Sequence, residues 1–191
     1  MANSDVIAAV SESLEARLAA ALSPLAQPAP TAQLHDLVTP VTNDPPTVTL
    51  FLYEILEDAS VRNRASTSRV VNGQLRSLKQ PLGLCLHYMV TAWAGDRRTE
   101  QRLLGRVLQV LYDDAVLDGL ALLGVLAGTP AKLQLSLAQI DLENRARIWA
   151  AIGQTYRLSV NYEVRVVNVD AETEATATPV RERHIVAGVP A

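Results

Sequence analysis

The stretch PLGLCLHYMVTAW, from Pro81 to Trp93, predicts a long β-strand that decides the fold. In an extended strand, residues i and i+2 project from the same face. The even positions form one apolar face, which consists of Leu82, Leu84, Leu86, Tyr88 and Val90. The odd positions form a second face, which consists of Cys85, His87, Met89, Thr91 and Trp93. A strand that is apolar on both faces is usually covered on both, so we expect a central strand with other elements packed above and below it.

The only cysteine, Cys85, lies two residues before His87 on the odd face of this stretch. A thiolate beside an imidazole base is the arrangement that thiol enzymes use. Cys85 lies inside an apolar run, however, whereas a nucleophile usually stands where a substrate can reach it. Free cysteine is also among the residue types most often buried. We therefore expect a packed thiol beside a hydrogen-bonded histidine, and a thiol enzyme that uses both residues is the alternative.

The first half of the chain predicts one helix and two further strands. Residues 4–22 place apolar side chains at helical spacing, with Ser4 as the expected N-cap. The proline-rich segment from Pro24 to Pro46 excludes a regular helix, although TAQLHDL (31–37) has the composition of a short edge strand. TVTLFLYEIL (47–56) is β-branched and aromatic, and it predicts a strand that is apolar on both faces.

The second half predicts two helices and two strands. Asp96 can cap a helix whose leucines and valines follow at helical spacing, and Asp141 can cap LENRARIWAAI (142–152), after which a glycine suits the helix end. KLQLSLAQI (132–140) and TYRLSVNYEVRVV (155–167) alternate apolar and polar residues, so each predicts a strand with one buried face. The fold class that follows is α+β, with a mixed sheet of about four to five strands packed against about three helices.

Two segments do not fit regular elements so well. VLDGLALLGVL (116–126) fits either a short helix or a packed loop. Residues 171–191 are polar with few large apolar side chains, so we expect a domain over residues 1–170 and a tail that is flexible or donates a strand through RHIVAGV (183–189).

Composition and charge exclude several classes of protein. The net charge of −3 argues against a general nucleic-acid binder, which would need a strongly basic face. The N-terminus has no basic region ahead of an apolar core, so we expect neither a signal peptide nor a membrane span, and synthesis in the cytoplasm. A single cysteine forms no internal disulfide and no CxxC motif.

Positive charge is concentrated in one segment. Between Asp58 and Asp96 there is no acidic residue, whereas this interval contains Arg62, Arg64, Arg69, Arg76 and Lys79. Such a segment is either a solvated loop or a contact surface for an acidic protein partner.

The sequence contains no recognisable catalytic or ligand-binding motif. The three histidines, His35, His87 and His184, show no zinc-ligand spacing, and no glycine-rich phosphate-binding loop is present. No second carboxylate cluster completes a pair for acid–base catalysis. We therefore expect no cofactor, no metal and no catalytic residue.

Three blocks of sequence resemble, in their order and spacing, the tail-terminator or cap proteins of phage-tail-like contractile injection systems. The blocks are VTLFLYEILEDASVRN (48–63), QPLGLCLHYMVTAWAGDRRTEQRLLGRVLQVLYDDAVL (80–117) and RIWAAIGQTYRLSVNYEVRVV (147–167). The positions that match the family pattern are Leu52, Tyr53, Arg62, Asn63, Pro81 to Tyr88, Thr91 to Trp93, Leu104, Gly105, Trp149, Gly153, Tyr156, Ser159 and Tyr162. The fold signature within them, expected to lie in the core, consists of Tyr53, Leu84, Leu86, Tyr88, Trp93, Trp149, Tyr156 and Tyr162.

The resemblance implies a structural role. Proteins of this family form a ring, six-fold in symmetry, at the end of the tail distal to the baseplate, where they stop growth of the inner tube and attach the last sheath ring. The expected partners are therefore further copies of the chain, the inner tube protein and the sheath protein, in a particle that acts inside the cell or is released on lysis. The alternative within this setting is a monomeric adaptor. Some family members carry a further C-terminal domain, whose function does not transfer to this chain.

A closed ring with two further partners needs several contact surfaces on each subunit. The candidates are the basic segment, the polar face of the last strand and the tail. The residues that we expect there are Arg62, Asn63, Arg64, Arg69, Arg76, Lys79, Arg157, Asn161, Arg165, Arg181 and Arg183.

Overall fold

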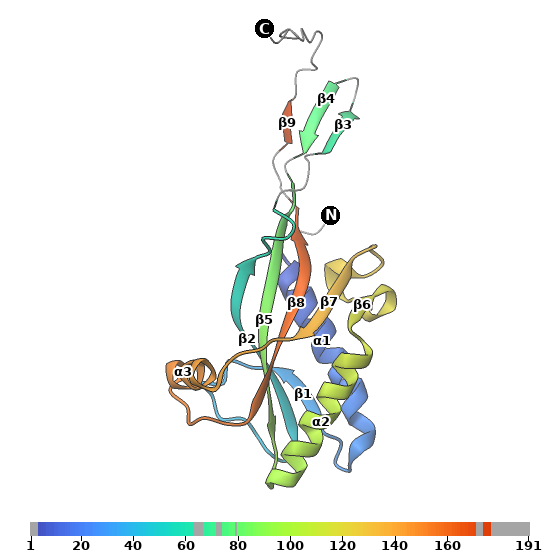
Figure 1. Ribbon diagram of the computed structural model, residues 1–191. Helices are drawn as coiled ribbons and strands as arrows, with labels where there is room; N and C mark the ends of the chain where they lie inside the picture. Colours follow the sequence, from blue (N-terminus) through green and yellow to red (C-terminus); the bar gives the residue numbers. More distant parts are fainter. Residues whose placement is uncertain (1–3, 63–66, 72–73, 79, 171–173, 177–191) are drawn as a thin grey trace, which may run out of the picture.

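The computed structural model describes residues 4–62, 67–71, 74–78, 80–170 and 174–176. Its main sheet has six strands in the order β1-β2-β5-β8-β7-β6. Strand β5 (Leu82–Trp93) pairs antiparallel with β2 (Thr47–Glu57) on one side and with β8 (Ser159–Val169) on the other. The central strand that the quoted stretch predicts is confirmed (Figure 1).

Short strands complete both edges of this sheet. The edge strand β1 (Thr31–Leu34) runs parallel to β2, which makes the sheet mixed, and it confirms the edge strand expected in the proline-rich segment. At the other edge β7 (Lys132–Leu137) pairs with β8 and with β6 (Val116–Asp118). The expected number of strands was therefore too low, because a strand of three residues such as β6 is too short for alternation to reveal it.

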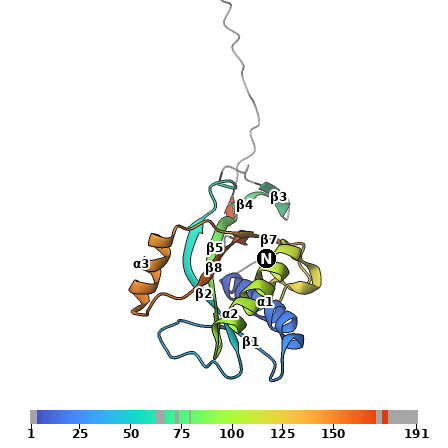
Figure 2. The same cartoon turned by 60° about the horizontal axis from the view of Figure 1, so that its bottom comes forward.

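The helices cover the sheet on both faces. Helices α1 (Val6–Leu22) and α2 (Arg97–Asp113) pack on the face formed by the even positions of β5 and build the larger apolar core. Helix α3 (Leu142–Ile152) lies over the odd face, where Trp149 and Met89 are fully buried in a second cluster. Figure 2 shows α3 on the opposite side of the sheet from α1 and α2.

The helix ends mostly follow the predicted caps. The side chain of Asp96 accepts a hydrogen bond from the Thr99 amide (3.0 Å), and that of Asp141 accepts one from the Asn144 amide (2.7 Å). Gly153 ends α3 in the left-handed conformation (φ 77°) that glycine adopts without strain. The expected cap at Ser4 is wrong, because α1 begins at Val6 with Asp5 in the N-cap position.

A second, three-stranded sheet projects from one end of the body (Figure 1). It consists of β3 (Thr67–Val71), β4 (Gln74–Leu78) and β9 (Glu174–Thr176), with β4 in the middle and both pairings antiparallel. The described residues of the basic segment therefore form two paired strands, which corrects the expectation of a solvated loop. The ambiguous stretch 116–126 is also resolved: it opens with β6 and continues as two turns of 3₁₀ helix, η2 (Gly119–Ala121) and η3 (Gly124–Leu126).

The last long strand begins later than its alternation predicts. β8 starts at Ser159, which pairs with Thr91 near the end of β5. Tyr156 lies before this point, in the segment that returns from α3, and its side chain is 39% exposed. Tyr156 is therefore not part of the core, because an alternating pattern continues in the sequence beyond the last residue that has a partner strand.

Candidate assembly surfaces

Most of the fold-signature residues are structural. Leu84, Leu86, Tyr88, Trp149 and Tyr162 are buried. The Tyr88 hydroxyl lies 2.7 Å from the Ser11 hydroxyl of α1, and burial raises the pKa of Tyr88 to about 12. Two further members, Tyr53 and Trp93, are half-buried beside α3. This group holds the sheet and helices together and offers little to a partner.

The predicted polar face of the last strand is not continuous. Asn161 pairs with Met89 in the centre of the sheet and is 1% exposed, because α3 covers this region. Arg165 is exposed on β8 and forms an ion pair with Glu163 (3.0 Å). The buried position of Asn161 contradicts a surface role for it in the isolated chain, and only Arg165 of this set is both exposed and within the strand.

Arg157 precedes β8 and is engaged within the chain. Its guanidinium lies 4.2 Å from the centre of the Trp93 ring and forms an ion pair with the buried carboxylate of Glu100 on α2. Arg97 binds the other oxygen of Glu100 at 2.8 Å. Arg157 therefore ties α2 to the segment between α3 and β8.

The hairpin end of the molecule carries the remaining described residues of the basic set. Arg62 is exposed and donates two hydrogen bonds to Glu57, at 3.1 and 2.6 Å, which hold it at the base of the projection. Arg69 of β3 and Arg76 of β4 occupy directly paired positions. The other candidates, Asn63, Arg64, Lys79, Arg181 and Arg183, lie outside the described residues.

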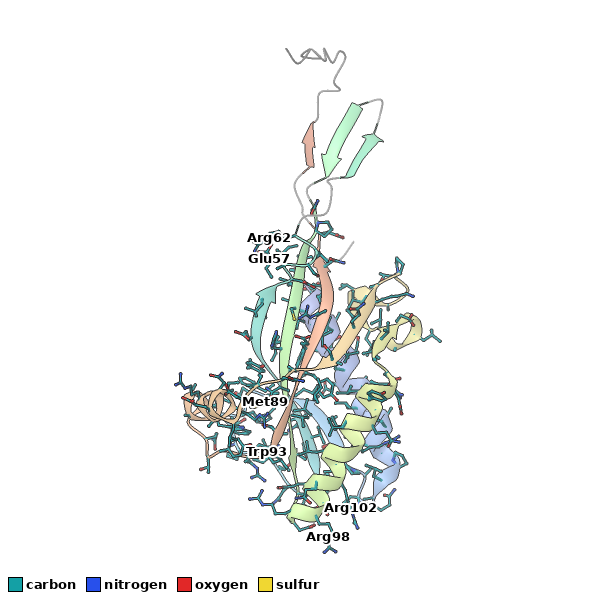
Figure 3. The ribbon with its side chains drawn as sticks, in the orientation of Figure 1. Glu57, Arg62, Met89, Trp93, Arg98 and Arg102 are labelled. Atoms are coloured by element: carbon teal, nitrogen blue, oxygen red, sulfur yellow. The ribbon has the colours of Figure 1, made fainter. Side chains whose placement is uncertain are left out.

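A second basic surface was missed by the sequence reasoning. Arg98 and Arg102, one turn apart near the start of α2, are both exposed. Figure 3 shows them at the end of the molecule opposite Arg62. The sequence does indicate this surface, because the outward face of the amphipathic helix α2 begins with arginines. The helix was predicted from its apolar face alone, so these arginines were not noted.

An apolar hollow lies between the C-terminal half of α2 and strand β7. It has a volume of about 690 Å³ and is lined mainly by Leu108, Leu111, Tyr112, Leu135, Leu137 and Tyr162. The Tyr112 side chain is 81% exposed, and Leu137 is exposed as well. Exposed apolar patches of this kind often mark contact sites between proteins.

The Cys85 and His87 side chains do lie side by side. The sulfur of Cys85 is 3.4 Å from Nε2 of His87. Cys85 is only 5% exposed, and burial raises the pKa of its thiol, with the negative charge of Glu163 acting in the same direction. A buried, protonated thiol is a poor nucleophile, so the geometry disfavours the thiol-enzyme alternative.

Among the helices in the described part of the chain, none is long and apolar enough to cross a membrane.

Comparisons with known proteins identify the family. The family model of the Pvc16 N-terminal domain matches residues 5–183. The chain is similar to the solved sheath/tube terminator of PVC, an extracellular contractile injection system, with a TM-score of 0.65 and 25% identity over 97% of this chain and 64% of that one. It is also similar in fold to the tube-terminating cap of the anti-feeding prophage, with a TM-score of 0.61 and 21% identity over 98% of this chain and 62% of that one.

The chain thus spans somewhat less than two thirds of either relative. No curated protein matches it. The resemblance inferred from the three sequence blocks, and the tail-terminator-like fold that it implied, are confirmed by these matches. With nearly its whole length matched, the chain belongs to the Pvc16 N-terminal domain family.

Proposed function

We propose that this protein is a structural cap of a contractile injection system, which terminates the inner tube and anchors the last ring of the sheath. The observation that carries the proposal is the match of 97% of the chain to a protein described as a sheath/tube terminator. The protein is made in the cytoplasm and becomes part of a phage-tail-like particle.

The cap acts as a ring of several copies. The family resemblance implies that this ring has six copies. A ring closes through two different patches on each subunit that meet head to tail. The apolar hollow beside Tyr112 suits one of these patches, because exposed aromatic residues next to a recess are typical of the central contacts in protein interfaces. Ring formation does not require a stable oligomer in solution, since the tube end can act as the template.

Tube and sheath need separate contact sites on each subunit. The basic hairpin, with Arg69 paired to Arg76, lies at one end of the molecule, and the α2 surface of Arg98 and Arg102 lies at the other (Figure 3). Two separated basic surfaces allow one subunit to contact two partners at once. We assign one partner to each end of the molecule.

The role is structural and not catalytic. The one candidate nucleophile, Cys85, is buried, and its raised thiol pKa keeps it protonated near neutral pH. Replacement of Cys85 by Ala, which removes a single sulfur from the core, should therefore leave particles that assemble normally once the protein folds.

Deletion of the gene, followed by electron microscopy of the particles, tests the function. We expect overlong tubes, particles without sheath, or no particles, and we expect a plasmid copy of the gene to restore normal ones. Tubes of normal, uniform length with firmly held sheaths in the deletion strain would refute the terminator role.

A further inference from the structure

Three side chains of types that can bind a metal ion lie close together on the α3 side of the main sheet. Cys85 and His87 project from the same face of β5, and Glu163 of β8 is the residue that pairs with His87 across the two strands. Their ligand atoms all lie within 4.8 Å of one another. The Cys85 sulfur is 3.4 Å from Nε2 of His87 and 4.0 Å from Oε2 of Glu163. Short sequence motifs could not reveal this cluster, because one of its members comes from a different strand.

We propose that Cys85, His87 and Glu163 form a three-ligand site for Zn²⁺. Zinc binds cysteine, histidine and carboxylate ligands at about 2.0 to 2.3 Å in tetrahedral geometry, which places the ligand atoms roughly 3.3 to 3.7 Å from one another. The two separations from the Cys85 sulfur lie close to this range, and the third, between His87 and Glu163, is within 4.8 Å, so the ligands must move closer together when the ion binds. The Cys85 thiol, which is protonated without metal, releases its proton to solvent when the ion binds. Thiolate, imidazole and carboxylate together suit zinc better than the oxygen-preferring Mg²⁺ or Ca²⁺.

The surroundings of His87 and Glu163 support the ligand assignment. Nδ1 of His87 faces the Tyr53 hydroxyl at 3.5 Å and a carboxylate oxygen of Glu54 at 3.8 Å, which leaves Nε2 directed at Cys85. Metal-binding histidines usually have such a carboxylate or other acceptor on the second ring nitrogen. Ser136 of β7 donates a hydrogen bond to Glu163 at 2.8 Å and fixes the third ligand.

The cluster also has a route to solvent. His87, Tyr53 and Glu54 line a cavity of about 530 Å³ under α3. The His87 side chain is 15% exposed and that of Glu163 is 20% exposed. The three protein ligands leave the fourth position of a tetrahedral ion for water.

One group competes with the metal. The Arg165 guanidinium binds both oxygens of Glu163, at 3.0 and 3.2 Å, and its positive charge opposes a cation at the same place. Removal of this charge should therefore tighten metal binding. A hydrogen-bonded thiol and imidazole without metal affinity would show no such response, and this difference separates the two interpretations.

The test is titration of the purified full-length chain with Co²⁺, a spectroscopic substitute for Zn²⁺. We expect a thiolate-to-cobalt charge-transfer band that saturates at one ion per chain and disappears when Zn²⁺ is added. Cys85→Ser should abolish the band, and Glu163→Gln should weaken cobalt binding. Arg165→Gln should strengthen it. Circular dichroism checks that each variant is folded.

A matched pair of exposed carboxylates on β2 keeps the test decisive if a core variant fails to fold. Glu54→Gln should weaken binding, because it removes a negative charge 3.8 Å from Nδ1 of His87. Glu57→Gln, which removes the partner of Arg62, should not change it. Absence of the charge-transfer band in the wild-type chain at saturating cobalt, or equal binding by the two glutamine variants, would overturn the proposal. Neither result bears on the cap function.

Discussion

At the scale of single residues, the least expected finding is the set of contacts around Arg157. The sequence places this arginine on the polar face of a strand, which suggests a free surface cation. In the structure it lies over Trp93 and pairs with Glu100 of α2, two residues that are distant in sequence. Such a contact depends on how α2 and the segment after α3 approach each other, and alternation within one strand carries no information about that.

Replacement of Arg157 by Ala should lower the free energy of unfolding. The change removes a cation–π contact and one partner of a buried carboxylate, although Arg97 still binds Glu100, so we expect a loss of about 1 to 2 kcal/mol. Urea denaturation measures it. Arg98→Ala, at an exposed position on α2, the helix that carries Glu100, is the control and should change stability by less than about 0.5 kcal/mol. Equal effects of the two variants would contradict a structural role for Arg157.

Tyr88 should make the fold sensitive to high pH. Burial raises its pKa to about 12, from 10 in the unfolded chain. Above pH 10 the unfolded chain loses this proton before the folded chain does, so the free energy of unfolding falls as the pH rises. The total fall, complete once the pH has passed 12, is roughly 2 to 3 kcal/mol.

Tyr88→Phe tests this directly. The variant loses the hydrogen bond to Ser11 at every pH, about 1 kcal/mol, but it should lack the extra loss between pH 10 and 12. Tyr112→Phe, at an exposed position, should behave like the wild type. An unchanged alkaline profile in Tyr88→Phe would show that another group controls it.

At the scale of elements, the long strands were predictable, whereas β1 was the one short strand that the sequence indicated. β2 and β5 each carry an apolar pattern over ten or more residues, and the caps at Asp96 and Asp141 fixed two helix starts. β3, β4 and β9 have three to five residues each, so their pairing depends on contacts that no local pattern encodes. The same reason limits what the sequence says about the candidate assembly surfaces. Single charged residues could be named from it, but not the residues of other elements with which they form ion pairs.

Gly83, near the start of β5, is required by a close approach. A Cβ at this position would clash with Cγ2 of Val61, in the segment that leads to the hairpin. Gly83→Ala should therefore destabilise the fold by about 1 to 3 kcal/mol, the usual cost of overpacking.

A double variant shows whether the clash is the cause. Val61→Ala removes the methyl group in question, so it should recover part of the stability lost in Gly83→Ala. Gly105→Ala in α2, where a Cβ meets nothing within 4 Å, should instead stabilise by up to about 1 kcal/mol. If the effects of Gly83→Ala and Val61→Ala on thermal stability simply add in the double variant, the clash between the two positions is not the cause.

At the scale of the whole molecule, the separation of its two basic ends matters most. Figure 3 places Arg98 and Arg102 far from Arg62 and from the hairpin above it. A cap that joins tube and sheath needs such separated sites, whereas an adaptor for one component needs only one.

Reversal of charge at Arg98 and Arg102, by substitution of both with Glu, should leave the protein folded but impair assembly. Both side chains are exposed on α2, so stability should change little, while an acidic contact on a partner would be repelled. Particle yield in a complemented deletion strain is the measurement. Arg147→Glu, at an exposed position on α3, is the control, and equal yields with the two variants would exclude the α2 surface as a contact.

As a cap, this protein occupies the end of the injection-system tube. Cryo-electron microscopy of purified particles tests it most directly, by resolving the tube end distal to the baseplate. We expect a closed ring at that end into which the six-stranded sheet and its three helices fit, with six copies around the tube axis. A distal end without density for this fold, or density for it only at the baseplate, would exclude the cap role.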